Sequence, residues 1–215
     1  MLEYLYRPPE QARDGAPVLV LLHGRGSHMG DLQGLAAALP PEVHLLTPQA
    51  PHAGASWGYG PGWAWYRYLG EDRAEPESLQ ASLTELEAFL DRLPELLDVE
   101  PGPLILGGFS QGGTTSLAYA LTRPGAVDGV VVLSGFLVPE EILGAGPAAL
   151  GDTPVFWGHG TKDPAVPFRL GLKGREKIRE AGGSLEARDY PMGHWVAREE
   201  MDDLREWLEG VLKEK

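Results

Sequence analysis

A serine between glycines is the residue with the clearest potential for chemistry. Residues 108–112 read Gly-Phe-Ser-Gln-Gly, after an apolar run at 104–106 and before a helical pattern. A nucleophile elbow needs this context, because a tight strand-to-helix turn lifts the hydroxyl off the sheet and tolerates only small residues nearby. The turn also places the serine at a helix N-terminus, where developing negative charge is stabilised. Ser110 is therefore the predicted nucleophile; the alternative is a glycine-rich turn with an incidental serine.

A serine nucleophile needs a base, and the base needs an acid that orients it. In folds with this elbow the order along the chain is serine, acid, histidine. His194 follows the last expected strand and Asp163 follows the apolar run 155–157, so both lie in loops at strand ends. Asp152 is the nearest rival acid, but it precedes its strand and would lie at the opposite end. The predicted triad is Ser110, His194 and Asp163.

Acyl transfer also needs two backbone N–H groups that stabilise an oxyanion. One is the amide of Gln111, directly after the serine. The other is expected from the glycine-rich loop at 23–26, where the Arg25 amide is the candidate. The alternatives for this loop are a plain turn or a phosphate-binding loop. The second is weaker, because the loop lacks the further glycine of a dinucleotide fingerprint and the lysine of a P-loop.

The sequence predicts neither a metal site nor cysteine chemistry. The chain has no cysteine, which excludes disulfides, thiolate zinc sites, iron–sulfur clusters and a cysteine nucleophile. The other histidines are His23, His28, His44, His52 and His159. His23 and His28 have no supporting ligand spacing, whereas His23 and His159 each precede a glycine at a strand end. We expect these two to hold loops by hydrogen bonds.

Apolar runs alternate with helical patterns along the chain. Continuous apolar runs, typical of strands buried on both faces, occupy residues 18–22, 43–46, 104–106, 130–133 and 155–157. Helical spacing occupies residues 77–93, 112–121, 168–180 and 197–213, with Pro94 expected to stop the first helix. This alternation predicts an α/β fold, an open, mostly parallel sheet with helices on both faces. Two irregular stretches, 47–70 and 136–152, are candidates for functional loops.

The charge balance excludes several classes of partner. The chain has 18 Lys and Arg against 31 Asp and Glu, a net charge of −13, so we expect no nucleic acid and no anionic membrane as partner. The longest apolar run is too short to span a bilayer, and no signal-peptide pattern opens the chain, which predicts a cytoplasmic location. A solvated helix face is expected for Glu199, Glu200, Asp202, Asp203, Glu206 and Glu209.

The chain resembles the phospholipase/carboxylesterase family of α/β-hydrolases, which includes the acyl-protein thioesterases. The matching segments, in family order, are residues 22–26, 48–51, 107–113, 159–163, 166–167 and 193–194. The resemblance implies a triad of Ser110, Asp163 and His194, with the Arg25 and Gln111 amides as oxyanion hole. It also implies one α/β-hydrolase domain over residues 1–215 without a separate lid domain. Such a domain would hydrolyse esters or thioesters without metal or organic cofactor, and would often form a homodimer.

Two features depart from the family pattern. Arg25 stands where the acyl-protein members usually carry an apolar residue, which puts a charge near the mouth of the site. Residues 56–68 also contain six Trp and Tyr, of which Trp65 and Tyr66 fall where the family has a Trp-aromatic pair. Trp65, Tyr66, Trp57 and Phe109 are the predicted pocket residues. The alternative for the aromatic stretch is a satellite hydrophobic cluster under a long loop.

Together these residues predict a serine carboxylesterase that acts on small or medium acyl chains through an acyl-enzyme. A lysophospholipase or an acyl-protein thioesterase is the alternative, and would need a long apolar channel. An acyltransferase or peptidase would use the same triad, because the fold does not fix the acceptor. A non-catalytic ligand-binding module is disfavoured, because such proteins typically lose a triad residue and all three are present here.

Overall fold

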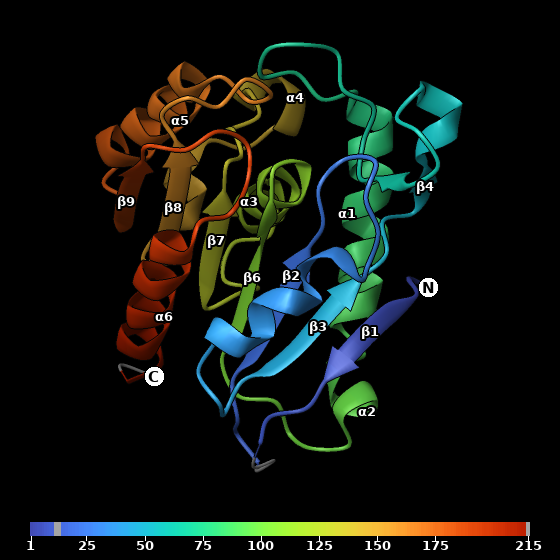
Figure 1. The fold of residues 1–215 in the computed structure, drawn as a ribbon, viewed down its shortest axis with the longest axis vertical. Coiled ribbons are helices and arrows are strands. Elements are labelled where there is room, and N and C mark those ends of the chain that lie inside the picture. Colours follow the sequence, from blue (N-terminus) through green and yellow to red (C-terminus); the bar gives the residue numbers. More distant parts are fainter. Residues whose placement is uncertain (11–13, 214–215) are drawn as a thin grey trace.

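A seven-stranded sheet forms the centre of the molecule (Figure 1). The structure is a computed structural model that describes residues 1–10 and 14–213. In spatial order the strands are β1 (Tyr4–Arg7), β3 (His44–Pro48), β2 (Val18–Leu22), β6 (Leu104–Phe109), β7 (Gly129–Leu133), β8 (Val155–Gly160) and β9 (Leu185–Tyr190). Among the described strands of this sheet, only β1 pairs antiparallel with its neighbour. The predicted mostly parallel sheet is confirmed.

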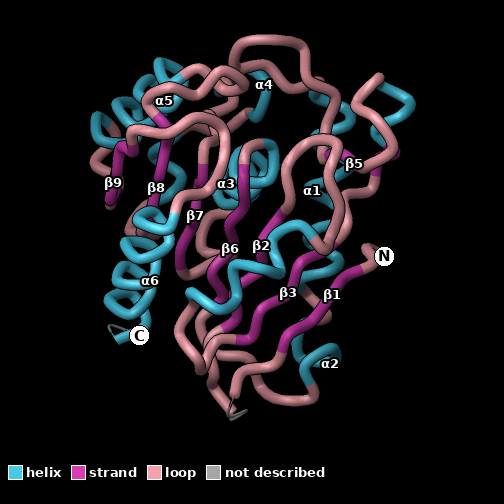
Figure 2. The backbone as a smooth tube through the Cα atoms, viewed as in Figure 1, coloured by secondary structure: helices cyan, strands magenta, loops and turns pink. Residues whose placement is uncertain are grey.

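Helices cover both faces of this sheet, as predicted (Figure 2). One face packs against α1 (Pro76–Leu90), α3 (Gln111–Thr122) and α5 (Phe168–Glu180). The other face packs against α6 (Arg198–Lys213) and a 3-10 helix, Asp31–Ala38. The short helices are α2 (Leu93–Leu97), α4 (Glu140–Leu143) and the 3-10 turns Gly54–Trp57 and Pro147–Leu150. Among the described residues, no helix combines the length and apolar character that crossing a membrane requires.

The continuous apolar runs follow from burial on both faces of the sheet. In β2, Val18 and Val20 pack into the cluster under α1 and α3, whereas Leu19 and Leu21 pack into the cluster under α6. Because side chains alternate between faces along a strand, every position must be apolar when both faces are covered. All five residues of β2 are buried, so this strand is a fixed support for the loop that follows it.

The helix predicted over residues 77–93 ends three residues earlier than predicted, and a second short helix follows it. Helix α1 ends at Leu90, and α2 starts at Leu93 with Pro94 in its first turn. Proline is tolerated there because the first N–H groups of a helix have no partner within it. Pro94 therefore starts a short helix instead of stopping a long one, which corrects the prediction.

The stretch predicted to be irregular at 47–70 contains a small hairpin. Its strands are β4 (His52–Ala53) and β5 (Trp63–Ala64), with a 3-10 turn between them. The hairpin lies beside the loop that follows β2, because Ser27 and Trp63 form a β-bridge. Residues 47–70 thus come to the edge of the sheet where the strands end at their carboxyl termini.

Candidate active site

Ser110 occupies a strained turn between β6 and α3. Its φ is +54° and its ψ is −115°, a conformation that side-chain-bearing residues rarely adopt. The neighbouring glycines allow the chain to pass close to β2. A Cβ on Gly108 would lie 2.4 Å from the Leu22 carbonyl oxygen, and one on Gly112 only 1.9 Å from it. The Gly-x-Ser-x-Gly pattern therefore follows from the close packing of the turn.

The structure brings the three side chains of the predicted triad into one chain of hydrogen bonds. His194 Nε2 lies 2.9 Å from Ser110 Oγ, and His194 Nδ1 lies 2.6 Å from Asp163 Oδ2. Asp163 follows β8 and His194 follows β9, so neighbouring parallel strands deliver both. Asp152 precedes β8 and is exposed, at the opposite end of that strand from Asp163. The rival acid is therefore not placed to orient this histidine.

Asp163 is held as a carboxylate. Burial raises the pKa of Asp163, but hydrogen bonds from His194 and from the Val166 and Ala165 amides outweigh it, and the net pKa lies below the usual value. Its Oδ1 accepts the Ala165 N–H at 2.8 Å and the Val166 N–H at 2.9 Å. Because an ionised Oδ2 can only accept, His194 must donate from Nδ1. The Nε2 lone pair then faces the Ser110 hydroxyl, which is the tautomer that a base needs.

A cavity of about 250 Å³ opens over Ser110. Its lining residues are Gly24, Arg25, Ser27, Asp31, Tyr66, Tyr68, Phe109, Ser110, Gln111, Phe136, Ala165, Val166 and His194. Arg25 and Gln111, the predicted oxyanion donors, both belong to this lining. In the part of the chain that the structure describes, neither amide has a protein acceptor. Two free N–H groups at the cavity wall can bind an anionic oxygen.

His23 anchors the loop that carries Arg25. Its Nδ1–H donates to the Gly24 carbonyl at 2.8 Å, and its Nε2 accepts from the Ala50 amide at 3.1 Å and from Gln49 Nε2 at 2.9 Å. Burial lowers the pKa of His23 to about 4, although the Gly24 carbonyl opposes this shift. The ring is therefore neutral at pH 7 and acts as a fixed donor and acceptor. His159 likewise contacts the Val166 carbonyl through Nε2, at 3.0 Å.

Two of the four predicted pocket residues lie elsewhere. Tyr66 and Phe109 line the cavity, but Trp65 and Trp57 are not among the lining residues. Trp65 is fully buried, and its Nε1–H donates to the His23 carbonyl at 3.0 Å. The Trp57 ring lies tilted against the ring of His52 in the hairpin, with ring centroids 4.9 Å apart. The two tryptophans support the loops behind the site, which corrects the prediction that they wall the pocket.

Sequence reasoning missed several wall residues. Tyr68, Phe136, Ala165 and Val166 line the cavity. Phe136 and Val166 lie in the loops after β7 and β8. Their position just after a predicted strand is the sequence feature that could have indicated a place in the cavity wall. Gln111 also has a second contact, because its side chain accepts from the Trp65 amide at 2.8 Å and donates to the Tyr66 carbonyl at 2.7 Å. This amide side chain fixes the aromatic loop to the elbow.

Glu200 does not belong to a solvated face. It is fully buried, and a Cβ on Gly158 would lie 2.0 Å from its Oε1. Neither carboxyl oxygen has a hydrogen-bond partner among the described residues. Burial raises the pKa of Glu200 to about 8, so the group is mostly protonated at pH 7. Its residue type hid this position: Glu200 shares a helix face with the buried Leu204 and Leu208, whereas its sequence neighbour Glu199 is exposed.

The described residues contain no cluster of three or more His, Cys, Asp or Glu side chains that could hold a metal ion. The polar groups of the site are instead those of a serine hydrolase. The polar residues that line the cavity include Ser110 and His194 of the triad, with Arg25, Ser27 and Asp31 from the segment after β2.

The chain as a whole is similar to known esterases and thioesterases. Residues 9–212 match the sequence profile of the family described as Phospholipase/Carboxylesterase. Acyl-protein thioesterase 1 of Cryptococcus neoformans is 30% identical, over 99% of this chain and 98% of its own length. A probable carboxylesterase of Oryza sativa is 34% identical, over 80% of this chain and 69% of its own length. The crystal structure of esterase PE8 has a TM-score of 0.82 at 28% identity, covering 98% of this chain and 99% of that one.

Proposed function

Because the chain belongs to the phospholipase/carboxylesterase family, we propose that it is a serine hydrolase that cleaves carboxylic esters of small or medium acyl chains. The observation that carries the proposal is the unbroken hydrogen-bond chain from Ser110 through His194 to Asp163. A serine hydroxyl that donates to a neutral imidazole is poised to attack an acyl carbon.

The proposed reaction has two halves. In the first, Ser110 Oγ attacks the ester carbonyl while His194 Nε2 takes its proton, and Asp163 stabilises the imidazolium. The carbon–oxygen bond to the alcohol then breaks, and His194 returns the proton to the leaving oxygen. In the second half, His194 takes a proton from water, whose oxygen attacks the acyl-enzyme. The bond between the acyl carbon and Ser110 Oγ then breaks, and His194 returns the proton to Oγ. The products are a carboxylic acid and free Ser110.

The Arg25 and Gln111 amides are proposed to hold the oxyanion in both halves. Donors fixed before the reaction stabilise developing charge without reorganising, which is typically the largest electrostatic contribution to such catalysis. The positive end of α3 adds to this field, because Ser110 is its N-cap residue. Loss of either donor should slow formation of both tetrahedral intermediates.

The size of the cavity favours small or medium acyl chains. Its volume of about 250 Å³ lies below the roughly 300–1,000 Å³ that drug-sized ligands occupy.

The second candidate is an acyl-protein thioesterase, favoured by the relative of that name. The cytoplasmic location, the homodimer, the single domain over residues 1–215 and the independence from cofactors stay predictions.

A chain-length series tests both candidates. We would measure kcat/KM for 4-nitrophenyl esters and matching thioesters from acetyl to palmitoyl. The test variant is Ser110→Ala. The control variant is Ser56→Ala, which changes an exposed serine. Ser110→Ala should lose at least about a thousandfold in activity. Turnover like that of the wild type in this variant would refute the proposal. A sharp optimum at long chains would favour the thioesterase instead.

A further inference from the structure

The Arg25 side chain places a positive charge at the cavity that holds Ser110. Arg25 is exposed, and it is the only Lys or Arg among the residues that line this cavity in the described chain. No carboxylate of the described residues lies within ion-pair distance of its guanidinium. In a chain with net charge −13, a cation that lines the same cavity as Ser110 and has no ion pair with a described residue is available to an anionic ligand.

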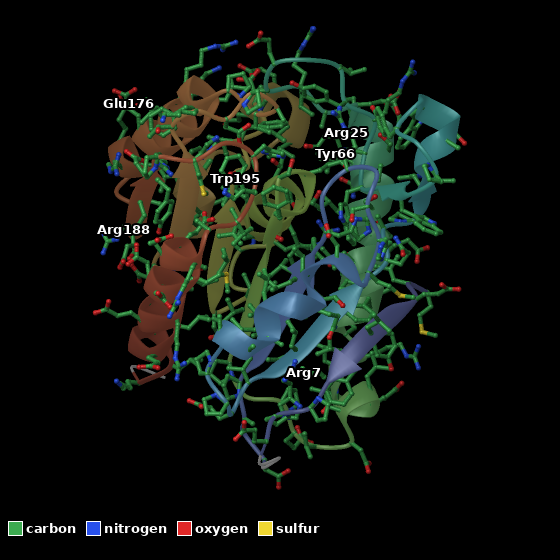
Figure 3. All side chains as sticks on the ribbon, viewed as in Figure 1. Arg7, Arg25, Tyr66, Glu176, Arg188 and Trp195 are labelled. Carbon is green, nitrogen blue, oxygen red and sulfur yellow. The ribbon has the colours of Figure 1, made fainter. Side chains whose placement is uncertain are left out.

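The aromatic stretch, residues 56–68, supplies the two rings against which the Arg25 guanidinium packs. Arg25 Cζ lies 4.8 Å from the centroid of the Tyr59 ring and 5.3 Å from that of the Tyr68 ring. The Tyr68 amide donates to Tyr59 Oη at 2.8 Å, which ties the two aromatic residues together. Figure 3 shows Arg25 beside Tyr66, at the same end of the molecule.

Backbone hydrogen bonds join the aromatic stretch to the loop after β2, which carries Arg25. The Gly26 amide donates to the Trp63 carbonyl at 2.7 Å, and the Trp63 amide donates to the Ser27 carbonyl at 2.8 Å. A Cβ on Gly26 would lie 2.6 Å from the Tyr59 carbonyl oxygen. The aromatic stretch, which the hydrolytic mechanism does not use, therefore holds Arg25 in place.

Stacking on aromatic rings leaves the in-plane N–H groups of a guanidinium free. Cation–π contact engages the face of the group, whereas carboxylates and phosphates bind its edge. Asp31 also lines the cavity, and its negative charge disfavours a dianion more than a monoanion. The site therefore suits a single carboxylate better than a phosphate.

Resting on the proposed function, we propose that Arg25 selects ester substrates that carry a second, ionised carboxylate near the scissile ester. Arg25 then has two roles at one position. Its amide faces the oxyanion, and its side chain binds the distal carboxylate. The substrate class is the half-ester of a dicarboxylic acid, or an ester of an alcohol that bears a carboxylate.

Paired esters that differ only in charge test this proposal and separate its two forms. The acyl-side pair is the mono-4-nitrophenyl ester of adipic acid and the same ester with a distal carboxamide. The alcohol-side pair is 4-acetoxybenzoate and 4-acetoxybenzamide. The measured quantity is the ratio of kcat/KM for the carboxylate to that for the amide within each pair. This ratio cancels any loss common to both substrates, including damage to the oxyanion hole.

Wild-type protein should favour the carboxylate in one pair by about five- to tenfold, as expected for a charge-assisted hydrogen bond at a partly exposed site. Arg25→Met should bring that ratio to one or below, and Arg25→Lys should keep part of it. Arg7→Met is the matched control, because Arg7 is exposed, has no ion pair with a described residue, and lies far from Arg25 in Figure 3. Added salt should lower the wild-type ratio.

The outcomes separate this proposal from the one on which it rests. Turnover of all four esters with the same ratios in wild type and Arg25→Met would overturn the role of Arg25 and leave the esterase proposal standing. No turnover of any of the four would overturn both. The pair in which Arg25→Met lowers the ratio identifies the side of the ester that carries the carboxylate.

Discussion

Replacing Glu200 by glutamine should stabilise the protein increasingly as the pH rises. Glu200 is fully buried beneath β8, and its carboxyl oxygens have no hydrogen-bond partner among the described residues. Burial raises its pKa from 4.5 to about 8, although the Ala197 backbone and the positive charge of Arg175 both act to lower that pKa. Glutamine has nearly the same shape and stays neutral, so it removes the cost of ionisation and keeps the packing.

The magnitude follows from the two pKa values. The unfolded chain releases this proton near pH 4.5, whereas the folded protein keeps it to about pH 8. The folded state therefore binds the extra proton in this window, and the contribution of Glu200 to stability falls as the pH rises through it. At 1.36 kcal/mol per pH unit the full difference is about 5 kcal/mol. We expect Glu200→Gln to gain about 2 to 5 kcal/mol relative to wild type between pH 5 and pH 8.

Urea unfolding of wild type and variant across this pH range measures the effect. Glu199→Gln is the matched control, because Glu199 is the exposed neighbour in the same first turn of α6. The difference between Glu200→Gln and wild type should grow with pH, and that for Glu199→Gln should stay flat. A constant difference for Glu200→Gln from pH 5 to pH 8 would refute the reasoning.

Two further substitutions test the geometry of the site. Asp163→Asn should lower kcat about 10³- to 10⁴-fold, because the histidine tautomer is lost, whereas Asp152→Asn should leave ester hydrolysis unchanged; the reverse result would identify Asp152 as the acid. Gly112→Ala should destabilise the fold by about 3 kcal/mol, because its Cβ would meet the Leu22 carbonyl. The control Gly210→Ala, in open space in a helix, should stabilise by about 1 kcal/mol. Equal effects of the two glycine substitutions in thermal unfolding would contradict the packing argument.

Much of the fold could be predicted because burial on both faces forces an apolar run. This holds for β2 and β7, in which every residue is buried. Strand β1 escaped prediction because it is an edge strand with mostly exposed residues, so neither an apolar run nor a buried face marks it. The end of α1 at Leu90 and the short helix α2 also escaped prediction, because leucines continue at helical spacing across the boundary between them.

The reacting residues could be predicted because each follows a strand in the order that the elbow requires. The walls of the cavity could not be predicted, because their positions depend on how distant loops pack. Trp65 is apolar and adjacent to Tyr66, yet only Tyr66 lines the cavity. Glu200 shows a different limit: its spacing from Leu204 and Leu208 places it on the buried face of α6, but a charged residue type predicts exposure, and the fold buries it against Gly158.

The role of Ser110 as nucleophile is tested most directly by mass spectrometry after reaction with a fluorophosphonate, which forms a stable adduct with an activated serine. We predict one adduct per chain, on the peptide that contains Ser110, formed at a rate that falls sharply in His194→Ala. An adduct on another residue, or full esterase activity in protein whose Ser110 is completely modified, would contradict the account.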